Sequence, residues 1–516
     1  MDTIFFMKKT FLLILLLGLG LNISTGQKLN EDRPNIVIVL ADDLGYSDIG
    51  AYGSEISTPN LDELAKNGIR FTQMHNTSKC FPSRAILLTG LYAQQVGMDK
   101  KPENFTNGIF FGEVLKRAGY TTLFVGKHHS TDNPYDWGFD HYYGLRDGAA
   151  NYFNPGLQRP GEPMPAQKRY GKRVFAFDGE LKQPYTPPAD YYATTTWTDW
   201  ACDFLKKYAE EEKPFLLYMS YQAPHDPLQA PESVIQKYEG VYDVGYEAIA
   251  AARYKRQIAS GLLDDRYPRS LPTYPSWSDL NDSIKADQVR RMQVYAAMID
   301  ELDRNIGRLI EVIKESGEWD NTVFMFLSDN GASAEVVDRG EGQIGDIDRW
   351  ASLQGNWSNV ANTPFRHNKN ASYEGGTATP FIFHWPRGLK NKGSVNHQPL
   401  HLIDIMPTLI ELSQAEYPRQ YKGRELPSLQ GVNILPLVRG EDVYRASPLY
   451  FDWQKGSALR TEDWKLVRWK DTWELYNMKK DRTETQNLAQ VEEDRLESMK
   501  LQWQKWAESV GIPYKN

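Results

Sequence analysis

The clearest pattern along the chain is a set of short, continuous apolar runs, each followed by polar residues. The run Asn35–Leu40 is rich in β-branched residues and leads into Ala41 and two aspartates. Continuous apolar runs of this length are typical of parallel strands buried on both faces. Further strands of the same kind are predicted at 121–125, 215–219, 322–327 and 381–383.

Helical periodicity lies between these runs. Apolar residues recur at helical spacing from Met292 to Ile313, and Gly317 is expected to end that helix. Proline and acidic residues mark another helix start at Thr58–Asp62, and a later helix is expected from about Asp404. Strands that alternate with helices predict an α/β fold, in which helices sandwich a large, mostly parallel (mixed) sheet.

The pattern changes near residue 415. Two short strand-like runs flank Glu462 and Asp463, and a helix is expected from about Glu492. We therefore expect a large α/β domain over 27–415 and a smaller C-terminal α+β subdomain over 416–516. The stretches 145–190 and 240–285 lack clean periodicity and are expected to be long surface loops.

The first residues are typical of an export signal. Lys8 and Lys9 precede an apolar run over 11–21, which is shorter than the ~20 residues of a membrane-spanning helix. We expect residues 1–26 to be a signal peptide and the mature chain to be periplasmic or secreted, without stable membrane insertion. Two cysteines in 516 residues exclude a disulfide framework. A net charge of −8 argues against a general nucleic-acid binder.

Candidate chemistry centres on Cys80, which precedes a helix-like run and lies four residues before Arg84. A cysteine at a helix N-terminus beside an arginine is in an electropositive setting that favours a thiolate or another anion. The alternatives are a disulfide with Cys202 and an unreactive buried thiol.

Acidic residues follow two of the predicted strands. Asp42 and Asp43 follow the first strand, and Asp329 and Asn330 follow the strand at 322–327. Ligands of open α/β sheets bind beyond the carboxyl ends of the strands, so both pairs can reach one site. Their hard oxygen atoms suit Ca²⁺ or Mg²⁺. Ordinary turn chemistry is the alternative for either pair alone.

Cations and histidines follow other strands. Lys127 and His129 come after the strand at 121–125, His225 comes after the strand at 215–219, and Lys369 lies before the last one. Fixed positive charges stabilise an anion that gains charge as a bond breaks, and a histidine can move protons near neutral pH. The alternative for any one of these lysines is a solvated surface charge, and for any one of these histidines a hydrogen-bonded polar residue of the core.

Several segments together resemble one family. Residues 80–90 read C-F-P-S-R-A-I-L-L-T-G and resemble the type I sulfatase signature, C-x-P-S-R-A-x-L-L-T-G. Asp42-Asp43, G-K-H-H at 126–129, A-P-H-D-P at 223–227, S-D-N-G at 328–331 and the P-F-R to Y-E-G-G segment at 364–376 are similar to other motifs of that family. The chain departs from the family with His128 in a tryptophan position and at 375–380, where many relatives carry an arginine.

The resemblance implies an arylsulfatase-like member of the alkaline phosphatase superfamily that cleaves a sulfate ester, with a sulfated small molecule or glycan as substrate. It also implies formylglycine, made from Cys80 by a formylglycine-generating enzyme or an anaerobic sulfatase-maturating enzyme. The implied cation is Ca²⁺, with Mg²⁺ as the alternative. The implied catalytic residues are Cys80, Arg84, Lys127, His129, His225 and Lys369, and the implied metal ligands are Asp42, Asp43, Cys80, Asp329 and Asn330.

In that family the hydrated aldehyde attacks sulfur. The resemblance implies that Arg84 and Lys127 polarise the nucleophile, that His225 and Lys369 bind the sulfate, and that His129 accepts a proton. Two other functions stay open: a phosphodiesterase or phosphonate monoester hydrolase of the same superfamily, and a catalytically silent glycan-binding relative.

Substrate selection is expected to depend on a loop beyond these motifs. The segment with Arg146, Asn151, Tyr152 and Phe153 mixes a cation with aromatic rings, so Arg146 is a candidate to pair with a sugar substituent and Tyr152 to stack on the ring. The alternative is a loop that packs on its own aromatics.

Overall fold

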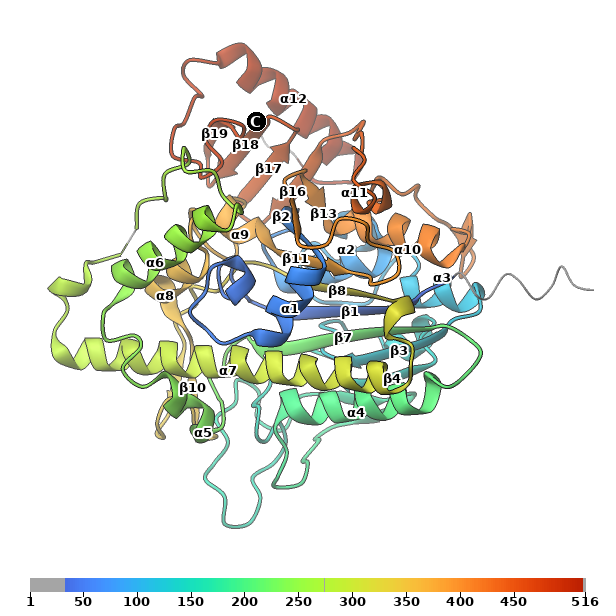
Figure 1. The fold of residues 1–516 in the computed structure, drawn as a ribbon, viewed down its shortest axis with the longest axis vertical. Helices are drawn as coiled ribbons and strands as arrows, with labels where there is room; N and C mark the ends of the chain where they lie inside the picture. Colours follow the sequence, from blue (N-terminus) through green and yellow to red (C-terminus); the bar gives the residue numbers. More distant parts are fainter. Residues whose placement is uncertain (1–32, 273, 514–516) are drawn as a thin grey trace, which may run out of the picture.

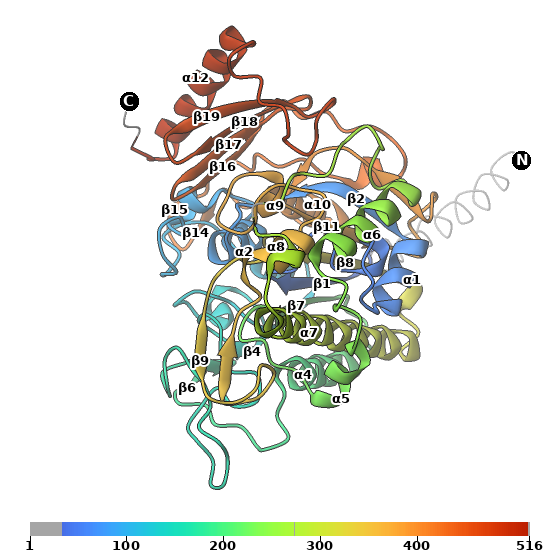
Figure 2. The same cartoon turned by 90° about the vertical axis from the view of Figure 1, so that its left-hand side faces the viewer.

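A computed structural model describes residues 33–272 and 274–513. The expected signal peptide lies outside the described residues. One large sheet crosses the middle of the molecule, and a second, smaller sheet with its own helix lies above it in Figures 1 and 2. No helix in the described part of the chain is long and apolar enough to cross a membrane.

The large sheet has eleven strands and is mixed, with a parallel centre. Its order is β12-β2-β11-β8-β1-β7-β3-β4-β5-β6, and β13 also pairs with β2. Strands β8, β1, β7, β3 and β4 run parallel to one another, whereas β11 runs antiparallel to both of its neighbours. The α/β sandwich with a mostly parallel sheet is therefore confirmed. The strands are β1 (Asn35–Asp42), β2 (Ile69–His75), β3 (Thr121–Gly126), β4 (His141–Leu145), β5 (Phe175–Phe177), β6 (Glu180–Lys182), β7 (Phe215–Pro224), β8 (Thr322–Ser328), β11 (Ala378–His384), β12 (Ser394–Asn396) and β13 (Leu400–His401).

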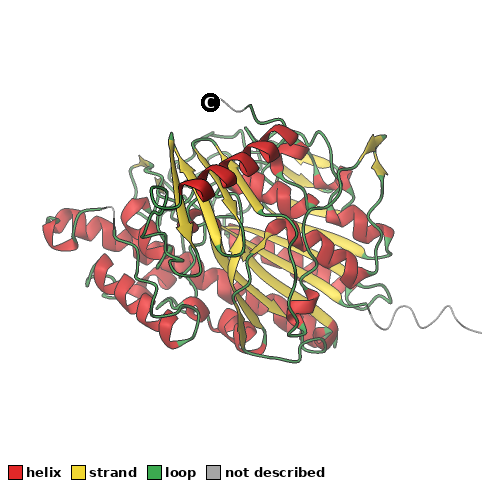
Figure 3. Ribbon diagram, turned by 90° about the horizontal axis from the view of Figure 1, so that it is seen from above, coloured by secondary structure: helices red, strands yellow, loops and turns green. Residues whose placement is uncertain are grey.

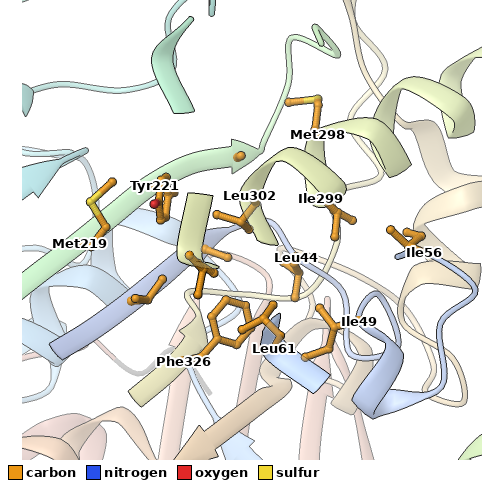
Figure 4. Packing of buried hydrophobic residues seen from close by; sticks show 14 of the residues in the cluster. Leu44, Ile49, Ile56, Leu61, Met219, Tyr221, Met298, Ile299, Leu302 and Phe326 are labelled. Carbon is orange, nitrogen blue, oxygen red and sulfur yellow. The ribbon is translucent and has the colours of Figure 1, made fainter. Parts of the chain in front are cut away.

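Strand β1 shows why the central runs are apolar throughout. Val37 and Val39 belong to the core on one face of the sheet, whereas Ile36 and Ile38 belong to the core on the other. Neighbouring side chains of a strand point to opposite faces, so a strand covered on both sides must be apolar at every position. Figure 4 shows residues of the first of these cores, among them Leu302 of the long helix α7 (Asp282–Glu315) and Phe326 of β8.

Helices cover both faces of the large sheet (Figure 1). Helix α7 shares the first core with α1 (Pro59–Asn67) and α4 (Ala193–Tyr208). The helix that begins at Cys80 belongs to the second core. The helices of the first face are α1 (Pro59–Asn67), α4 (Ala193–Tyr208), α5 (Glu232–Ile235), α6 (Tyr246–Ala259), α7 and α8 (Gln354–Ala361). Helices α2 (Cys80–Thr89), α3 (Phe111–Arg117), α10 (Ile405–Ser413) and α11 (Leu435–Val438) belong to the second core, and so does α12 (Glu493–Ser509), which packs on the C-terminal sheet.

The C-terminal region forms a four-stranded antiparallel sheet on which α12 packs (Figure 3). Its strands are β16 (Leu449–Trp453), β17 (Gly456–Arg460), β18 (Trp464–Trp469) and β19 (Thr472–Asn477). A buried charge network ties it to the large domain: Lys465 Nζ lies 2.7 Å from Glu374 Oε1 and 2.9 Å from Glu484 Oε1. The backbone N–H of Glu374 also donates to Glu484 at 2.8 Å. Smaller elements are α9 (Glu374–Thr377) and two hairpins, β9–β10 (Asp338–Gly340, Arg349–Ala351) and β14–β15 (Gln420–Tyr421, Arg424–Glu425).

One expectation about the loops was wrong in part. The stretch 240–285 contains α6, a helix of fourteen residues, and 145–190 contains β5 and β6. Helix α6 buries one face, on which the apolar Tyr246, Ile249 and Ala250 are followed by the polar Arg253 and Gln257. An apolar stripe broken by buried polar residues gives little periodic signal, which is why the pattern did not reveal it.

Candidate active site

The candidate residues lie at one edge of the large sheet because the topology brings six strand ends there. Strands β1, β3, β7 and β8 are adjacent and parallel, and their carboxyl ends lead into Asp42, Lys127, His225 and Asp329. Strand β2 has the same direction and leads into the loop before Cys80. Strand β11 runs the opposite way, so its beginning, which follows Lys369 and Glu374, lies at this same edge. The expectation of a shared site at the strand ends is met.

Asp42 is the centre of one buried group of charges. The Nζ atom of Lys127 donates to its Oδ2, and the Nη2 atom of Arg84 lies 3.5 Å from the same oxygen. Arg84 also donates from Nε to Asp329 Oδ2 at 2.8 Å. Burial alone would raise the pKa of Asp42, but the charges of Lys127, His225 and Arg84 outweigh it and hold that pKa well below its usual range.

Asp43 is the centre of a second group that adjoins the first. Lys369 Nζ lies 2.8 Å from Asp43 Oδ2, and His225 Nε2 lies 3.7 Å from that oxygen. The amide of Asn330 donates to Asp43 Oδ1 at 2.6 Å. Asp43 has a left-handed backbone, with φ of 63°, which is uncommon outside glycine and turns its carboxylate toward these partners.

Close packing fixes the segment that carries Asn330. A Cβ added at Gly331 would lie 2.0 Å from the carbonyl oxygen of Gly375, so only glycine fits where the two backbones meet. Glycine is thus needed in the S-D-N-G segment for contact with the Y-E-G-G segment. This contact sets the distance between Asn330 and the loop that carries Lys369.

The two aspartate groups leave buried oxygens without partners. In the described structure, Asp42 Oδ1 and Asn330 Oδ1 are buried and accept no hydrogen bond. Unpartnered buried oxygens are rare in native proteins and call for an explanation such as a bound ion. Ligand atoms of Asp42, Asp43 and His225 also lie within 4.8 Å of one another. Burial and the charge of Asp42 raise the pKa of Asp329, which marks an excess of negative charge that a cation would relieve. The donor set therefore fits a hard divalent cation.

Cys80 is the first residue of α2, and its side chain is buried. The expected depression of its thiol pKa was wrong: burial raises the pKa of Cys80, although the ammonium groups of Lys369, Lys79 and Lys127 oppose that rise. The helix N-terminus does not compensate for lost hydration. Cys80 and Cys202 are both free thiols, which excludes the disulfide alternative in this structure.

The two histidines after Lys127 differ in their surroundings. His128 lies among the rings of Phe105, Phe110 and Phe124, where burial lowers its pKa to about 3. His129 has φ of 68° and is only partly buried. Burial and the adjacent Lys127 charge depress the pKa of His129, while Asp42 acts in the opposite sense.

The loop that was expected to select the sugar does not present its aromatic ring. Tyr152 is 0% exposed, packs against Tyr192 and donates to the backbone carbonyl of His225 at 2.9 Å. Asn151 is buried as well and donates to the carbonyl of Ala166. The stacking hypothesis for Tyr152 is therefore wrong, and the packing alternative holds. Through this hydroxyl contact, Tyr152 supports the segment that carries His225.

Two residues near the site were missed by sequence reasoning. Asp226 is buried, and its Oδ1 lies 2.7 Å from His225 Nδ1. Glu335 lies 3.9 Å from Lys369 Nζ. The first was detectable, since a carboxylate directly after a candidate catalytic histidine often orients its ring. The second lies in an irregular segment between β8 and β9, where no pattern points to it.

The comparisons with known proteins agree with this geometry. A family model described as Sulfatase matches residues 34–415, and one described as N-sulphoglucosamine sulphohydrolase, C-terminal, matches 366–508. An arylsulfatase of Klebsiella aerogenes is 31% identical, over 78% of this chain and 92% of the relative. An uncharacterized sulfatase of Schizosaccharomyces pombe is 30% identical, over 93% and 94%. The crystal structure of Ps i-CgsB in complex with k-i-k-neocarrahexaose has a TM-score of 0.69 at 26% identity, covering 93% of this chain and 94% of that one.

The fold and site thus define a sulfuric ester hydrolase. The chain belongs to the sulfatase family of the alkaline phosphatase superfamily.

Proposed function

We propose that the enzyme cleaves sulfate esters of a sulfated carbohydrate, through formylglycine made from Cys80 and with a bound Ca²⁺ ion. The observation that carries the proposal is the convergence of Lys127, Arg84, Lys369 and His225 on two buried aspartates beside Cys80. A carbohydrate substrate is supported by Ps i-CgsB, whose structure was solved with a hexaose bound.

The cation would be held by oxygens of Asp42, Asp43, Asp329 and Asn330 and by the modified side chain of Cys80. The unpartnered Oδ1 atoms of Asp42 and Asn330 support this assignment. When bound, Ca²⁺ supplies fixed positive charge that stabilises anionic oxygens. Mg²⁺ has the same preference for oxygen ligands but demands a stricter octahedral geometry, so a shell drawn from three separate segments favours Ca²⁺.

The cationic side chains bind and orient the reacting groups. Lys369 and His225 both face the Asp43 carboxylate, and we assign them to the oxygens of the sulfate. Arg84 and Lys127, which both face Asp42, hold the residue at position 80 in place. In a site closed to water, such fixed charges stabilise the negative charge that grows as the S–O bond breaks.

Proton transfers are assigned to two histidines. Asp226 holds Nδ1 of His225, which leaves Nε2 of that ring, on the side of Asp43, to protonate the departing alcohol. His129 accepts a proton from position 80, because it is partly exposed and its ring senses the charges of Lys127 and Asp42. His128 is enclosed by aromatic rings and is not assigned a role.

Formylglycine supplies an aldehyde, whose hydrate is a nucleophile that the protonated thiol of Cys80 does not offer. Its formation needs a maturation partner, a formylglycine-generating or anaerobic sulfatase-maturating enzyme. We also propose that the chain is exported to the periplasm or secreted, as Lys8, Lys9 and the apolar run after them support.

A direct test is sulfate release by the matured enzyme from 4-nitrophenyl sulfate and from a panel of sulfated saccharides. We expect turnover of both kinds of substrate, with a higher kcat/KM on one saccharide. Release of phosphate from 4-nitrophenyl phosphate at a higher kcat/KM than sulfate release from any sulfate ester would contradict the proposal.

A further inference from the structure

A cluster of three charged residues lies directly outside the proposed site. We call Lys79, Lys168 and Glu335 the mouth cluster. Lys79 Nζ lies 3.7 Å from Glu335 Oε1, and Lys168 Nζ lies 3.7 Å from Glu335 Oε2. The three residues come from distant parts of the chain, so their meeting is a product of the fold.

The mouth cluster continues the site toward solvent. Lys369, which touches Asp43, also lies 3.9 Å from Glu335 Oε1. The side chain of Lys369 is 1% exposed, whereas that of Glu335 is 33% exposed. A substrate whose sulfate is held by Lys369 can therefore place its remaining atoms beside the mouth cluster, because the exposure rises in that direction.

Two buried tryptophans hold the lysines in place. Lys79 Nζ lies 5.9 Å from the ring centroid of Trp453, and Lys168 Nζ lies 5.0 Å from that of Trp350. Ring faces attract ammonium groups at these distances and limit their motion. Trp453 donates from Nε1 to Asn370, next to Lys369, and Trp350 donates from Nε1 to Asp226, next to His225. The two ammonium groups are thus tied to the residues that flank the proposed sulfate site.

The charges in the mouth cluster do not balance. Within the described residues, Glu335 is the one carboxylate in ion-pair distance of Lys79. Lys168 also lies 3.5 Å from Asp226 Oδ2, but Asp226 is already paired with His225. Lys369 has its shorter contact with Asp43, so Lys79 and Lys168 share one partly exposed carboxylate, which leaves positive charge for another anion.

We propose that the mouth cluster binds a second anionic group of the substrate, a carboxylate or another sulfate close to the reacting ester. Lys79 and Lys168 pair with that group. Glu335 is the counterion that bridges the two lysines when no substrate is bound, and it weakens the binding of an added anion. This inference rests on the proposed function and specifies its substrate as a saccharide with at least two negative charges.

The test compares a monosulfated disaccharide with the same disaccharide carrying a second sulfate, and with one carrying a uronate carboxylate. The selectivity ratio is kcat/KM for each doubly charged sugar divided by that for the singly charged one. We expect a ratio above one for the wild type, a decrease of about fivefold in Lys168→Gln and an increase of about threefold in Glu335→Gln, as partly exposed ion pairs allow. If the variants change the ratio of the disulfated sugar more than that of the uronate sugar, the second group is a sulfate; the reverse identifies a carboxylate.

Lys182→Gln is the matched control, because Lys182 also pairs with a glutamate and contacts a ring, but on the edge strand β6. Its ratio should equal that of the wild type. Lys79→Gln should act like Lys168→Gln, provided that mass spectrometry shows full conversion of the neighbouring Cys80.

Two results overturn the anionic subsite if the variants still release sulfate. One is a selectivity ratio that is unchanged in both lysine variants, and the other is a ratio that moves in the same direction in Lys168→Gln and Glu335→Gln. Absence of sulfate release from every substrate, 4-nitrophenyl sulfate included, overturns the proposed function and this inference with it.

Discussion

His225 and Asp226, adjacent in sequence, are also partners in space: Nδ1 of the imidazole lies 2.7 Å from Oδ1 of the carboxylate. Burial alone would raise the pKa of Asp226, but His225 and Lys168 outweigh burial and hold that pKa below its usual range. Asp226 is therefore an anion that orients the ring together with its own backbone carbonyl, which lies 2.6 Å from the same Nδ1 atom. Trp350 donates to its other oxygen at 3.1 Å and keeps the carboxylate in place.

Asp226→Asn should reduce kcat by about 10- to 100-fold, with a smaller change in KM, because the ring is no longer held in one tautomer and orientation. Steady-state kinetics on 4-nitrophenyl sulfate and the pH profile of kcat test this positioning role. Asp178→Asn is the matched control. Asp178 also pairs with a histidine, its Oδ2 lying 3.0 Å from His141 Nδ1, but this pair is outside the site. If both variants lose activity equally, the effect of Asp226 on His225 is not specific.

Cys80→Ala and Cys80→Ser should both abolish turnover and leave the fold intact, since neither side chain can give the aldehyde. Circular dichroism and melting temperature check the fold, and mass spectrometry of the wild-type tryptic peptide checks the conversion of Cys80. Cys202→Ala is the matched control, because Cys202 is a free, buried cysteine on α4. Turnover by Cys80→Ser at more than a small fraction of the wild-type rate would rule out formylglycine as the nucleophile.

The strand pattern was enough to predict the centre of the fold. Val37 and Ile38 face opposite cores, and this double burial is what a continuous apolar run encodes. The same logic placed Asp42 and Asp329 at one edge, since parallel neighbours end together. Helix α6 was missed because Arg253 and Gln257 interrupt its buried face.

Side-chain partners were less predictable than positions. The S-D-N-G and Y-E-G-G segments were identified, but the contact between Gly331 and Gly375 depends on the antiparallel course of β11. Tyr152 was expected at the surface because a Tyr in a polar, glycine-rich stretch gives no sign of burial. Glu335 could not be predicted as part of the site, because its lysine partners come from three separate segments that only the fold brings together.

Removal of the cation should lower both activity and thermal stability. Dialysis against a chelator is expected to reduce the melting temperature, because an ion bound only to the native state stabilises it by ~2.7 kcal/mol at a hundredfold excess over its Kd. Asp329→Asn should reproduce much of this loss while leaving an oxygen to accept from Arg84. Elemental analysis identifies the ion, and readdition of Ca²⁺ or Mg²⁺ shows which one restores turnover. Unchanged activity and melting temperature after chelation, with no metal detected, would remove the site.

The last prediction concerns the buried network that joins the C-terminal sheet to the large domain. Burial raises the pKa of Glu484 to about 7, with the charge of Lys465 opposing and that of Glu374 adding to the rise. Between pH 4.5, the ordinary pKa of a glutamate, and about pH 7, Glu484 therefore keeps a proton in the folded protein that it releases in the unfolded chain. The stabilisation is complete below pH ~4.5 and is lost as the pH rises through ~7, by an amount on the order of 3 kcal/mol. Urea denaturation at several pH values and saturating Ca²⁺ should show this decrease in the wild type and a weaker one in Glu484→Gln, whose amide stays neutral.

Glu492→Gln is the matched control, because Glu492 is partly exposed and pairs with Arg495 at the surface. An identical pH dependence in the wild type and Glu484→Gln would show that Glu484 does not titrate in this range.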